Sequence, residues 1–375
     1  MMNKNKTKHK VLFEDARKLK GISKNSVDLV VTSPPYPMIE MWDDLFRKLN
    51  SNIDKALKKQ DGQEAFELMH YELDKTWKEL DRVVKPGGFV CINIGDATRT
   101  IGDQFQLYSN HSRIINKLTS FSFKTLPLIL WRKTTNAPNK FMGSGMLPAG
   151  AYVTLEHEFI LIFRKERKRE FNTISLKENR NNSALFWEER NIWFSDIWNL
   201  SAVRQTMNKK KLRDRNAAYP FELPYRLINM YSVKDDNVLD PFLGTGTTLL
   251  AAIASGRNSI GFEYESNFSS VIKEKLQTAK TFSNETVRKR LKGHMNFISD
   301  HKEQKKSLKY INEIHNFPVK TRQERKLQLS VVCNLDYKDL SNIMVEHKQL
   351  EGNEEWTETF NKQQKISYSQ KTLPL

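Results

Sequence analysis

The sequence predicts an α/β fold built on a largely parallel sheet, and three observations support it. Strand-like and helix-like segments alternate along most of the chain. The run at residues 26–31 is apolar enough to be a strand buried on both faces. Residues 237–265 supply a strand, a glycine-rich turn, a helix and a second strand within the length of one βαβ unit. With 375 residues, 38% of them hydrophobic, the chain can bury a large core.

The first half of the chain is expected to alternate regularly between strand and helix. Residues 11–36 predict a strand, a short helix and a second strand. A Pro-Gly-Gly turn leads into a strand from Phe89 to Ile94. The other expected segments are helices at 39–82 and 111–119, and strands at 126–133 and 157–165 that can form an antiparallel pair.

The second half loses this regularity and then regains it. Residues 165–215 interleave charged side chains with phenylalanine and tryptophan and show no periodicity. After Pro224 a short helix is expected at 225–231, ahead of the βαβ unit. From about residue 280 the chain is rich in lysine, glutamine and asparagine, and a mainly helical structure is expected.

The net charge of +17 is the clearest global property of the chain. A protein this basic is expected to bind a polyanion, and a lysine-rich solvated surface is the alternative. No apolar run approaches ~20 residues and none follows the basic N-terminus, so neither a transmembrane helix nor a secretory signal is expected. The two cysteines, Cys91 and Cys333, have no neighbours at metal-ligand spacing, which predicts no metal site and a reducing, cytosolic setting.

The glycine-rich turn "DPFLGTGTT" predicts a small-cofactor site. Gly244 and Gly246 allow a tight turn and a close backbone approach to a ligand at the carboxyl end of a strand. The turn lacks the Lys-Ser/Thr pair of a P-loop, and Leu249 stands where a dinucleotide fingerprint needs glycine. Glu263 ends the next strand, where a carboxylate suits ribose hydroxyls; a solvated strand end is the alternative. A nucleoside without phosphates is indicated, which points to S-adenosylmethionine.

"VVTSPPY" at 30–36, followed far downstream by "LDPFLGTGTT", resembles the DNA amino-methyltransferases, which methylate exocyclic nitrogens of cytosine or adenine. The catalytic-type motif precedes the cofactor-type motif, an order similar to that of the β class of this family. The likeness covers most of residues 11–270 and includes "FEDAR", "KPGGFVCINIGD", "ILWRK", "LEHEFILIF" and "YPFELPYRLI". It implies a class I methyltransferase fold in permuted order: a Rossmann-like, seven-stranded mixed sheet with one antiparallel strand.

The resemblance also implies a division of the chain into four parts. Residues 1–135 would form the catalytic half with the SPPY motif, and residues 217–280 the cofactor-binding half. Residues 136–216 would form an inserted target-recognition region, except that strand 155–164 belongs to the catalytic sheet. Residues 281–375 would be a helical, basic C-terminal extension.

The resemblance assigns roles residue by residue. The catalytic motif would be Ser33, Pro34, Pro35 and Tyr36. Asp15 would accept a hydrogen bond from the adenine amino group of the cofactor, and Glu263 would hold its ribose. The full set of expected cofactor-binding residues is Asp15, Ala16, Asp240, Pro241, Phe242, Gly244, Thr245, Gly246, Thr247 and Glu263.

The chemistry of amino methylation explains why such a motif suits the site. The lone pair of the target nitrogen is delocalised into the ring, so the site needs acceptors for the amino hydrogens and a surface for a base flipped out of the duplex. Ser33 and the Pro34 carbonyl can accept, and the two prolines fix the direction of that carbonyl. Tyr36 can stack on the base. The methyl donor is a sulfonium, so neither a metal nor a covalent intermediate is required.

Trp131 and Asp96 are further candidates for the target pocket; the alternatives are an ordinary strand-end aromatic for Trp131 and a helix cap for Asp96. In the basic, aromatic segment, Arg204, Gln205 and Asn208 are candidate readers of base edges. Arginine pairs with guanine, and glutamine or asparagine with adenine. A loop that contacts only the phosphate backbone is the alternative for these three residues.

The expected activity is site-specific methylation of cytosine N4 in double-stranded DNA, because family members with serine at the first motif position mostly act there. Adenine N6 is the alternative within the family, and a catalytically silent DNA-binding protein is the alternative outside it. Cytosine C5 is disfavoured, since Cys91 follows Val90 and not a proline. The resemblance implies a prokaryotic, cytoplasmic enzyme, monomeric or homodimeric. It would be paired functionally, without a stable complex, with a restriction endonuclease, and would have no membrane partner.

Overall fold

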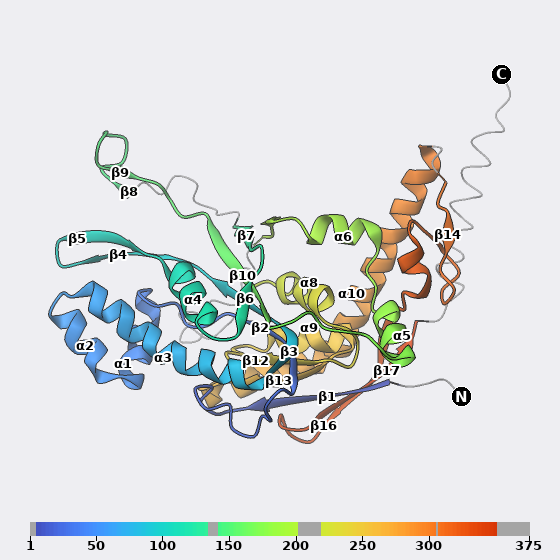
Figure 1. Cartoon of the computed structure of the whole chain (residues 1–375), viewed down its shortest axis with the longest axis horizontal. Coiled ribbons are helices and arrows are strands. Elements are labelled where there is room, and N and C mark those ends of the chain that lie inside the picture. Colours follow the sequence, from blue (N-terminus) through green and yellow to red (C-terminus); the bar gives the residue numbers. More distant parts are fainter. Residues whose placement is uncertain (1–4, 134–141, 202–218, 305–306, 351–375) are drawn as a thin grey trace.

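The computed structural model describes residues 5–133, 142–201, 219–304 and 307–350, and a large mixed sheet runs through them (Figure 1). Eleven strands form this sheet in the order β11-β7-β10-β3-β2-β12-β13-β1-β17-β16, with β6 beside β10 off this path. Their bounds are β1 (Asn5–Leu12), β2 (Val27–Thr32), β3 (Val84–Ile94), β6 (Phe123–Thr125), β7 (Ile129–Arg132), β10 (His157–Lys165), β11 (Ile197–Asn199), β12 (Asn237–Asp240), β13 (Asn258–Phe262), β16 (Ser330–Tyr337) and β17 (Ile343–Gln349).

The centre of the sheet confirms the expected fold class. β1, β13, β12, β2 and β3 run parallel to one another. β10 is antiparallel to β3, and β7 is antiparallel to β10. These seven neighbours therefore contain one reversed strand, β10, as expected. The count of seven is too small for the whole sheet, however, because β6, β11, β16 and β17 extend it.

Helices surround the sheet, and those of the first half lie close to the expected positions. Residues 39–82 divide into a 3₁₀ turn and three helices, of which the longest is α3. The helices and short 3₁₀ helices are η1 (Glu40–Trp42), α1 (Asp43–Leu49), α2 (Ser51–Lys58), α3 (Gly62–Val83), α4 (Asn110–Thr119), α5 (Ile174–Asn182), α6 (Trp187–Trp193), α8 (Glu222–Tyr231), α9 (Thr247–Ser255), η2 (Ser266–Phe268), α10 (Ser269–Glu303) and η3 (Arg322–Lys326).

Both faces of the central strands are covered by helices, which explains why β2 is apolar throughout. All six residues of β2 are buried. On one face Val30 shares a hydrophobic cluster with Trp77 of α3. On the other face Leu29 shares a cluster with Leu227 of α8 and Ala251 of α9. A parallel strand with no solvent-exposed face is expected to be a continuous apolar run.

The connection from β1 to β2 differs from the expectation, because it forms turns where a short helix was expected. Leu19, Gly21 and Asn25 have φ angles of 34°, 78° and 53°, whereas an α-helix requires negative φ. Arg82 of α3 donates hydrogen bonds to the carbonyls of Ile22 and Leu19. These hydrogen bonds hold the loop against α3, and the loop forms turns rather than a helix.

The C-terminal extension is not helical throughout, which corrects the expectation for residues 281–375. Residues 281–303 continue α10, but the chain then forms the short pair β14 (Tyr310–Ile311) and β15 (Pro318–Val319), and later β16 and β17. β17 pairs antiparallel with β1, so the extension completes the main sheet. Burial in β17 alternates residue by residue, and this period of two favours a strand although the segment is rich in charge.

The aromatic segment after β10 is also more regular than expected, since it contains α5, α6 and β11. Phe186, Trp193 and Trp198 are buried, so these rings build core rather than a nucleic-acid surface. Glu189 of α6 accepts two hydrogen bonds from Arg290 of α10, at 2.6 and 2.7 Å. The segment is thus docked against α10, as Figure 1 shows on the right of the view.

Two β-hairpins project from the carboxyl edge of the sheet, on the left of Figure 1. One comprises β4 (Ala97–Ile101) and β5 (Gln104–Tyr108) and follows β3; the other comprises β8 (Met142–Gly143) and β9 (Ala151–Tyr152) and lies between β7 and β10. Phe105 and Tyr152 stack with ring centroids 4.8 Å apart and join the two hairpins. Within the described ranges, no helix combines the length and apolar character needed to cross a membrane.

Candidate active site

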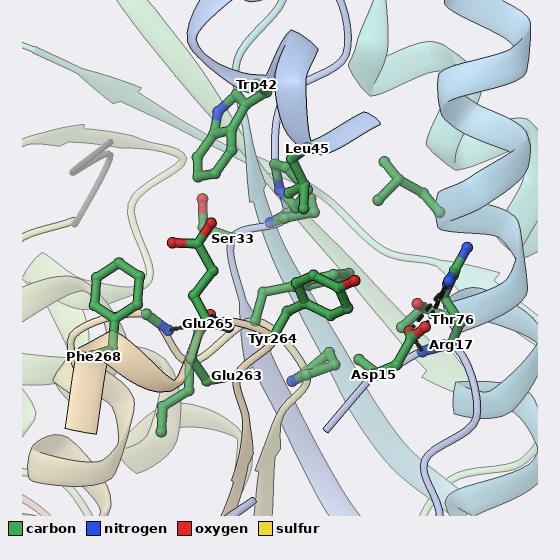
Figure 2. Close-up of a pocket in the computed structure, with 18 of the residues that line it drawn as sticks. Asp15, Arg17, Ser33, Trp42, Leu45, Thr76, Glu263, Tyr264, Glu265 and Phe268 are labelled. Atoms are coloured by element: carbon green, nitrogen blue, oxygen red, sulfur yellow. Dashed lines mark hydrogen bonds and ion pairs between the residues drawn. The ribbon is translucent and has the colours of Figure 1, made fainter. Parts of the chain in front are cut away.

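A cavity lies at the carboxyl ends of the parallel strands, where ligands of open α/β sheets bind (Figure 2). The segments after β1, β2, β12 and β13 each contribute to its wall. It encloses about 1160 Å³ of space, part of it continuous with solvent. The expected site residues that line it are Asp15, Ala16, Ser33, Pro34, Pro35, Pro241, Phe242, Gly244, Thr245, Thr247 and Glu263. The structure therefore brings most of the SPPY motif and the glycine turn together, although some 200 residues separate them in sequence.

Several residues of the wall carry no sequence signal that would have identified them. Figure 2 shows Trp42, Leu45 and Thr76 approaching from the helical segment, and Tyr264, Glu265 and Phe268 from the loop after β13. Trp42 ends η1 and Leu45 lies in the first turn of α1, in a stretch whose composition predicts only a charged helix. Their role as cavity wall follows from the packing of α1 and α3 beside the sheet, which sequence periodicity does not specify.

Asp240, Gly246 and Tyr36 were expected in the site but do not line the cavity. The Asp240 carboxylate is buried and accepts hydrogen bonds from Thr32 Oγ1 at 2.6 Å and Thr248 Oγ1 at 2.5 Å. It also accepts from the Phe242 N–H at 3.0 Å and from Tyr219 Oη at 3.3 Å. Burial raises the pKa of Asp240, and these hydrogen bonds oppose the rise. Asp240 thus ties β2, β12 and α9 together behind the wall.

The glycine turn has the backbone conformation that the sequence predicted. Gly244 and Gly246 have φ angles of 53° and 80°, which disfavour any residue with a side chain. A Cβ at Gly246 would also come within 3.3 Å of the Ile272 side chain on α10. Lys275 of α10 donates hydrogen bonds to Thr245 Oγ1 at 2.7 Å and Thr247 Oγ1 at 3.2 Å. Burial lowers the pKa of Lys275 to about 8.

The Glu263 carboxylate lines the cavity beside the glycine turn. It accepts hydrogen bonds from the Gly244 N–H and the Glu265 N–H, each at 2.8 Å. Burial raises its pKa to about 6, although both backbone hydrogen bonds oppose this rise. The position at the end of β13 and the remaining lone pairs leave Glu263 able to accept from hydroxyl groups of a ligand.

Asp15, the residue expected to contact adenine, is already paired with a neighbour. Arg17 donates to its carboxylate through Nε at 2.9 Å and Nη2 at 2.6 Å, and through Nη1 to Glu72 at 2.5 Å. Burial alone would raise the pKa of Asp15, but the hydrogen bonds and charge of Arg17 hold it below its usual value. Asp15 lines the cavity as part of this pair, so Arg17 and Glu72 belong to the same wall (Figure 2).

Tyr36 is 7% exposed and offers little free ring surface for stacking. Its hydroxyl donates to Glu158 Oε2 at 2.8 Å, accepts from Asn93 Nδ2 at 2.8 Å and lies 3.1 Å from Ser33 Oγ. Burial, followed by the nearby Glu158 charge, raises the pKa of Tyr36 well above its ordinary value. Glu158 and Asn93 were not among the expected site residues, although they lie in the segments "LEHEFILIF" and "KPGGFVCINIGD" of the family likeness.

Trp131 and Asp96 have the structural roles that the sequence left open as alternatives. Trp131 is 2% exposed and donates from Nε1 to the Leu200 carbonyl at 2.9 Å. Asp96 accepts from the backbone N–H of His111 at 3.1 Å and contacts the His111 ring at 2.7 Å, in the first turn of α4. Neither residue lines the cavity. Arg204, Gln205 and Asn208 lie outside the described residues.

The structure offers no support for thiol chemistry at this site. Cys91 is fully buried in β3, and burial raises the pKa of its thiol, which disfavours the thiolate that a nucleophile requires. Over the described part of the chain, no group of three or more His, Cys, Asp and Glu side chains is arranged to hold a metal ion.

The fold and the cavity at its carboxyl edge define a protein of the class I methyltransferase fold. A profile of the N6/N4 DNA methylase family matches residues 27–274, and the chain therefore belongs to this family of DNA methylases.

Individual relatives agree with this assignment. The type II methyltransferase M.MthZI of Methanothermobacter thermautotrophicus is 53% identical over 326 residues, which cover 86% of this chain and 90% of that protein. M.MjaI of Methanocaldococcus jannaschii is 50% identical over 72% of this chain and 91% of its own length. The crystal structure of TTHA0409, a putative DNA modification methylase from Thermus thermophilus, complexed with S-adenosyl-L-methionine, superimposes with a TM-score of 0.55 and 30% identity. The match covers 71% of this chain and 92% of that one.

Proposed function

We propose that this DNA methylase transfers a methyl group from S-adenosylmethionine to cytosine N4 at a specific site in double-stranded DNA. The observation that carries the proposal is that Ser33 and Glu263 line one cavity. A base-contacting hydroxyl and a carboxylate suited to ribose thus face the same space. The methylase complex with S-adenosyl-L-methionine, from a relative 30% identical, supports the choice of cofactor.

The residues of the cavity fit this cofactor by their chemistry. Glu263 would accept hydrogen bonds from the ribose hydroxyls, and Asp15 would contact the adenine amino group. Trp42 and Phe268 supply flat apolar surface in the lining of the same cavity. When bound, the cofactor supplies an electrophilic methyl group on sulfur. No pyrophosphate has to be accommodated, which agrees with a turn that lacks the lysine of a P-loop.

At the target nitrogen, the protein itself would accept hydrogen bonds and hold the base in position. Ser33 Oγ and the Pro34 carbonyl would accept the two amino hydrogens, which favours a pyramidal nitrogen whose lone pair is free for the methyl group. The base has to leave the duplex to reach them. Holding base and methyl donor in line is the source of most of the rate enhancement that we infer.

The choice of cytosine N4 rests on serine at the first motif position. A hydroxyl is a weaker acceptor than a carboxylate, and resemblance to serine-containing members of the family favours cytosine. Adenine N6 is the second candidate, supported by the breadth of the family itself, which includes both activities.

Residues 136–216 are our proposed target-recognition region, with β10 part of the catalytic sheet. Within it, we assign base reading to Arg204, Gln205 and Asn208. The type II methyltransferases among the relatives support a restriction–modification setting. We therefore infer a prokaryotic, cytoplasmic enzyme, monomeric or homodimeric, that protects DNA from a cognate endonuclease without forming a stable complex with it.

Labelled-cofactor assays test the proposal directly. Duplex DNA of mixed sequence is incubated with the protein and methyl-labelled S-adenosylmethionine, then digested to nucleosides and separated. We expect label in N4-methylcytosine, and we expect Ser33→Ala to lose transfer while it still binds cofactor. Label in N6-methyladenine would establish the second candidate instead, and DNA binding without any transfer would identify a catalytically silent DNA-binding protein.

A further inference from the structure

A buried hydrogen-bond network joins the last residue of the SPPY motif, Tyr36, to three residues outside the motif. Its members are Tyr36, Asn93 on β3, and Glu158 and Lys133 at the adjoining ends of β10 and β7. Glu158 is 8% exposed and Asn93 is 2% exposed. Glu158 accepts from Tyr36 Oη at 2.8 Å, from Asn93 Nδ2 at 2.6 Å and from Lys133 Nζ.

The chemistry of the partners fixes the direction of each hydrogen bond. A carboxylate only accepts, so the single hydroxyl hydrogen of Tyr36 is directed to Glu158. Asn93 has to present its NH₂ group to this pair, because its carbonyl oxygen would face the carboxylate oxygen at 2.6 Å. Tyr36 Oη therefore receives one hydrogen from Asn93 and keeps one lone pair for Ser33, whose Oγ lies 3.1 Å away.

Since Tyr36 has no hydrogen left to give, Ser33 is the donor in the Ser33–Tyr36 bond. Its own hydroxyl hydrogen then points into the network, and both of its lone pairs remain for the cavity that Ser33 lines. The amino group to be methylated presents its own hydrogens to the site. A serine hydroxyl that pointed its hydrogen into the cavity would therefore face another donor and could not accept from the amino group in that direction.

We propose that Glu158 is a positioning residue that, through Tyr36, holds the Ser33 hydroxyl as a hydrogen-bond acceptor toward the target amino group. The inference rests on the proposed function and extends it to a residue outside the catalytic motif. Glu158 does not touch the base in this scheme. Glu158 acts through the Glu158–Tyr36 and Tyr36–Ser33 hydrogen bonds. In this scheme Tyr36 orients Ser33 and does not stack on the base.

The packing around the network is consistent with a fixed arrangement. A Cβ at Gly95 would come within 3.1 Å of Tyr36 Cε2 and 3.3 Å of Glu158 Cγ, so glycine there allows the ring and the carboxylate to meet against β3. Lys133 supplies the compensating charge that a buried carboxylate needs. Its ammonium also lies 4.8 Å from the centre of the Trp131 ring, a second contact that restrains it.

A double-mutant cycle tests the inference. Single-turnover methyl transfer is measured at saturating cofactor and DNA for the wild type, Glu158→Ala, Tyr36→Phe and the double variant, with cofactor dissociation constants measured beside the rates. We expect each single variant to transfer methyl roughly tenfold to a hundredfold more slowly, the equivalent of one lost polar contact. Cofactor affinity should change little, and the double variant should be no slower than Tyr36→Phe.

Two further variants separate positioning from general damage to the fold. Glu158→Gln keeps an oxygen that can accept from Tyr36, so it should recover most of the rate lost in Glu158→Ala. Glu156→Ala removes a partly exposed carboxylate two residues away, which pairs with Arg132 at 3.1 Å, and should leave the rate unchanged.

The outcomes distinguish the two proposals. Suppose that the wild type transfers methyl but Glu158→Ala slows the reaction by the same factor in the wild type and in Tyr36→Phe. This result would overturn the inference and leave the proposed function intact. A normal rate in Glu158→Ala would do the same. A wild type that labels adenine would overturn only the choice of base, because the acceptor requirement is shared by both amino groups. A wild type with no transfer to any DNA would remove both proposals.

Discussion

At the scale of single residues, burial and the nearest partners together set the pKa values of the carboxylates around the cavity. Asp15 and Glu263 follow strands and Asp240 ends one, yet each has a different environment. Asp15 is held by Arg17, which lowers its pKa, whereas burial raises the pKa values of Asp240 and Glu263. Similar residues at similar positions therefore serve different purposes.

Glu263 should make cofactor binding depend on pH. Its pKa is raised from 4.5 to about 6 in the folded protein, so between these values the folded state binds more protons than the unfolded state. The free energy of unfolding of the cofactor-free protein should therefore fall as pH rises through that window. Ribose hydroxyls donate best to the ionised form, so affinity should weaken as pH falls through about 6.

Calorimetric titration with S-adenosylmethionine, in two buffers of different ionisation enthalpy near that pH, checks this expectation. Binding should release protons, because it favours the ionised carboxylate. Glu263→Gln serves as the control and should bind weakly without this pH dependence. An affinity that stays constant between about pH 5 and 7 would contradict the assigned role of Glu263.

Asp240→Ala should act on stability before it acts on chemistry. The change leaves the buried Thr32 and Thr248 hydroxyls and the Phe242 N–H without their acceptor. Each such group costs about 1–3 kcal/mol when left unsatisfied. Urea denaturation should therefore show a lower free energy of unfolding, and Asp240→Asn, which keeps one acceptor oxygen, should lose less. Full stability with weak cofactor binding would instead indicate direct contact with the ligand.

At the scale of elements, the C-terminal strands β16 and β17 are part of the main sheet. β17 lies between β1 and β16, and its buried Ile343 shares a hydrophobic cluster with Ile253 of α9 and Ile272 of α10. These helices flank the glycine turn. The extension therefore supports the side of the cavity formed by the glycine turn, through the sheet and through α10, although no residue beyond Phe268 lines the cavity in the described ranges.

Ile343→Ala tests whether this extension folds with the sheet. Removing a buried isoleucine side chain should lower the free energy of unfolding by about 2–5 kcal/mol. Met344→Ala on the opposite face of β17, at a half-buried position, is the matched control and should cost much less. Denaturation followed by circular dichroism should give one transition shifted as a whole. A separate early transition confined to part of the signal would show that the extension unfolds independently.

At the scale of the whole molecule, the order of the motifs and the shape of the sheet are connected. The SPPY motif follows β2 and the glycine turn follows β12, and these two strands are neighbours in the sheet. Neighbouring parallel strands end at the same edge of the sheet. The two motifs therefore meet at one cavity, although a long stretch of sequence separates them. The net charge of +17 then suits an enzyme whose substrate is a polyanion.

The sequence by itself determined the fold class, the family and the two motifs, SPPY and the glycine turn, that meet at the cavity. Apolar runs such as β2 specify buried parallel strands, and glycines at positive φ specify the turn, because both signals are local and have few structural alternatives. The same local signals placed α3, α4 and the β7–β10 pair close to where the structure has them.

Only the tertiary structure decided which side chains reach the cavity and which remain behind it. Asp240, Tyr36, Trp131 and Asp96 all sit at strand ends that sequence reasoning directs toward the site, but their partners come from segments distant in sequence. Glu158 is the clearest case: one carboxylate in an apolar strand acquires a role because Asn93 and Tyr36 meet it across the sheet. Long-range packing sets such hydrogen bonds, and no local pattern encodes them.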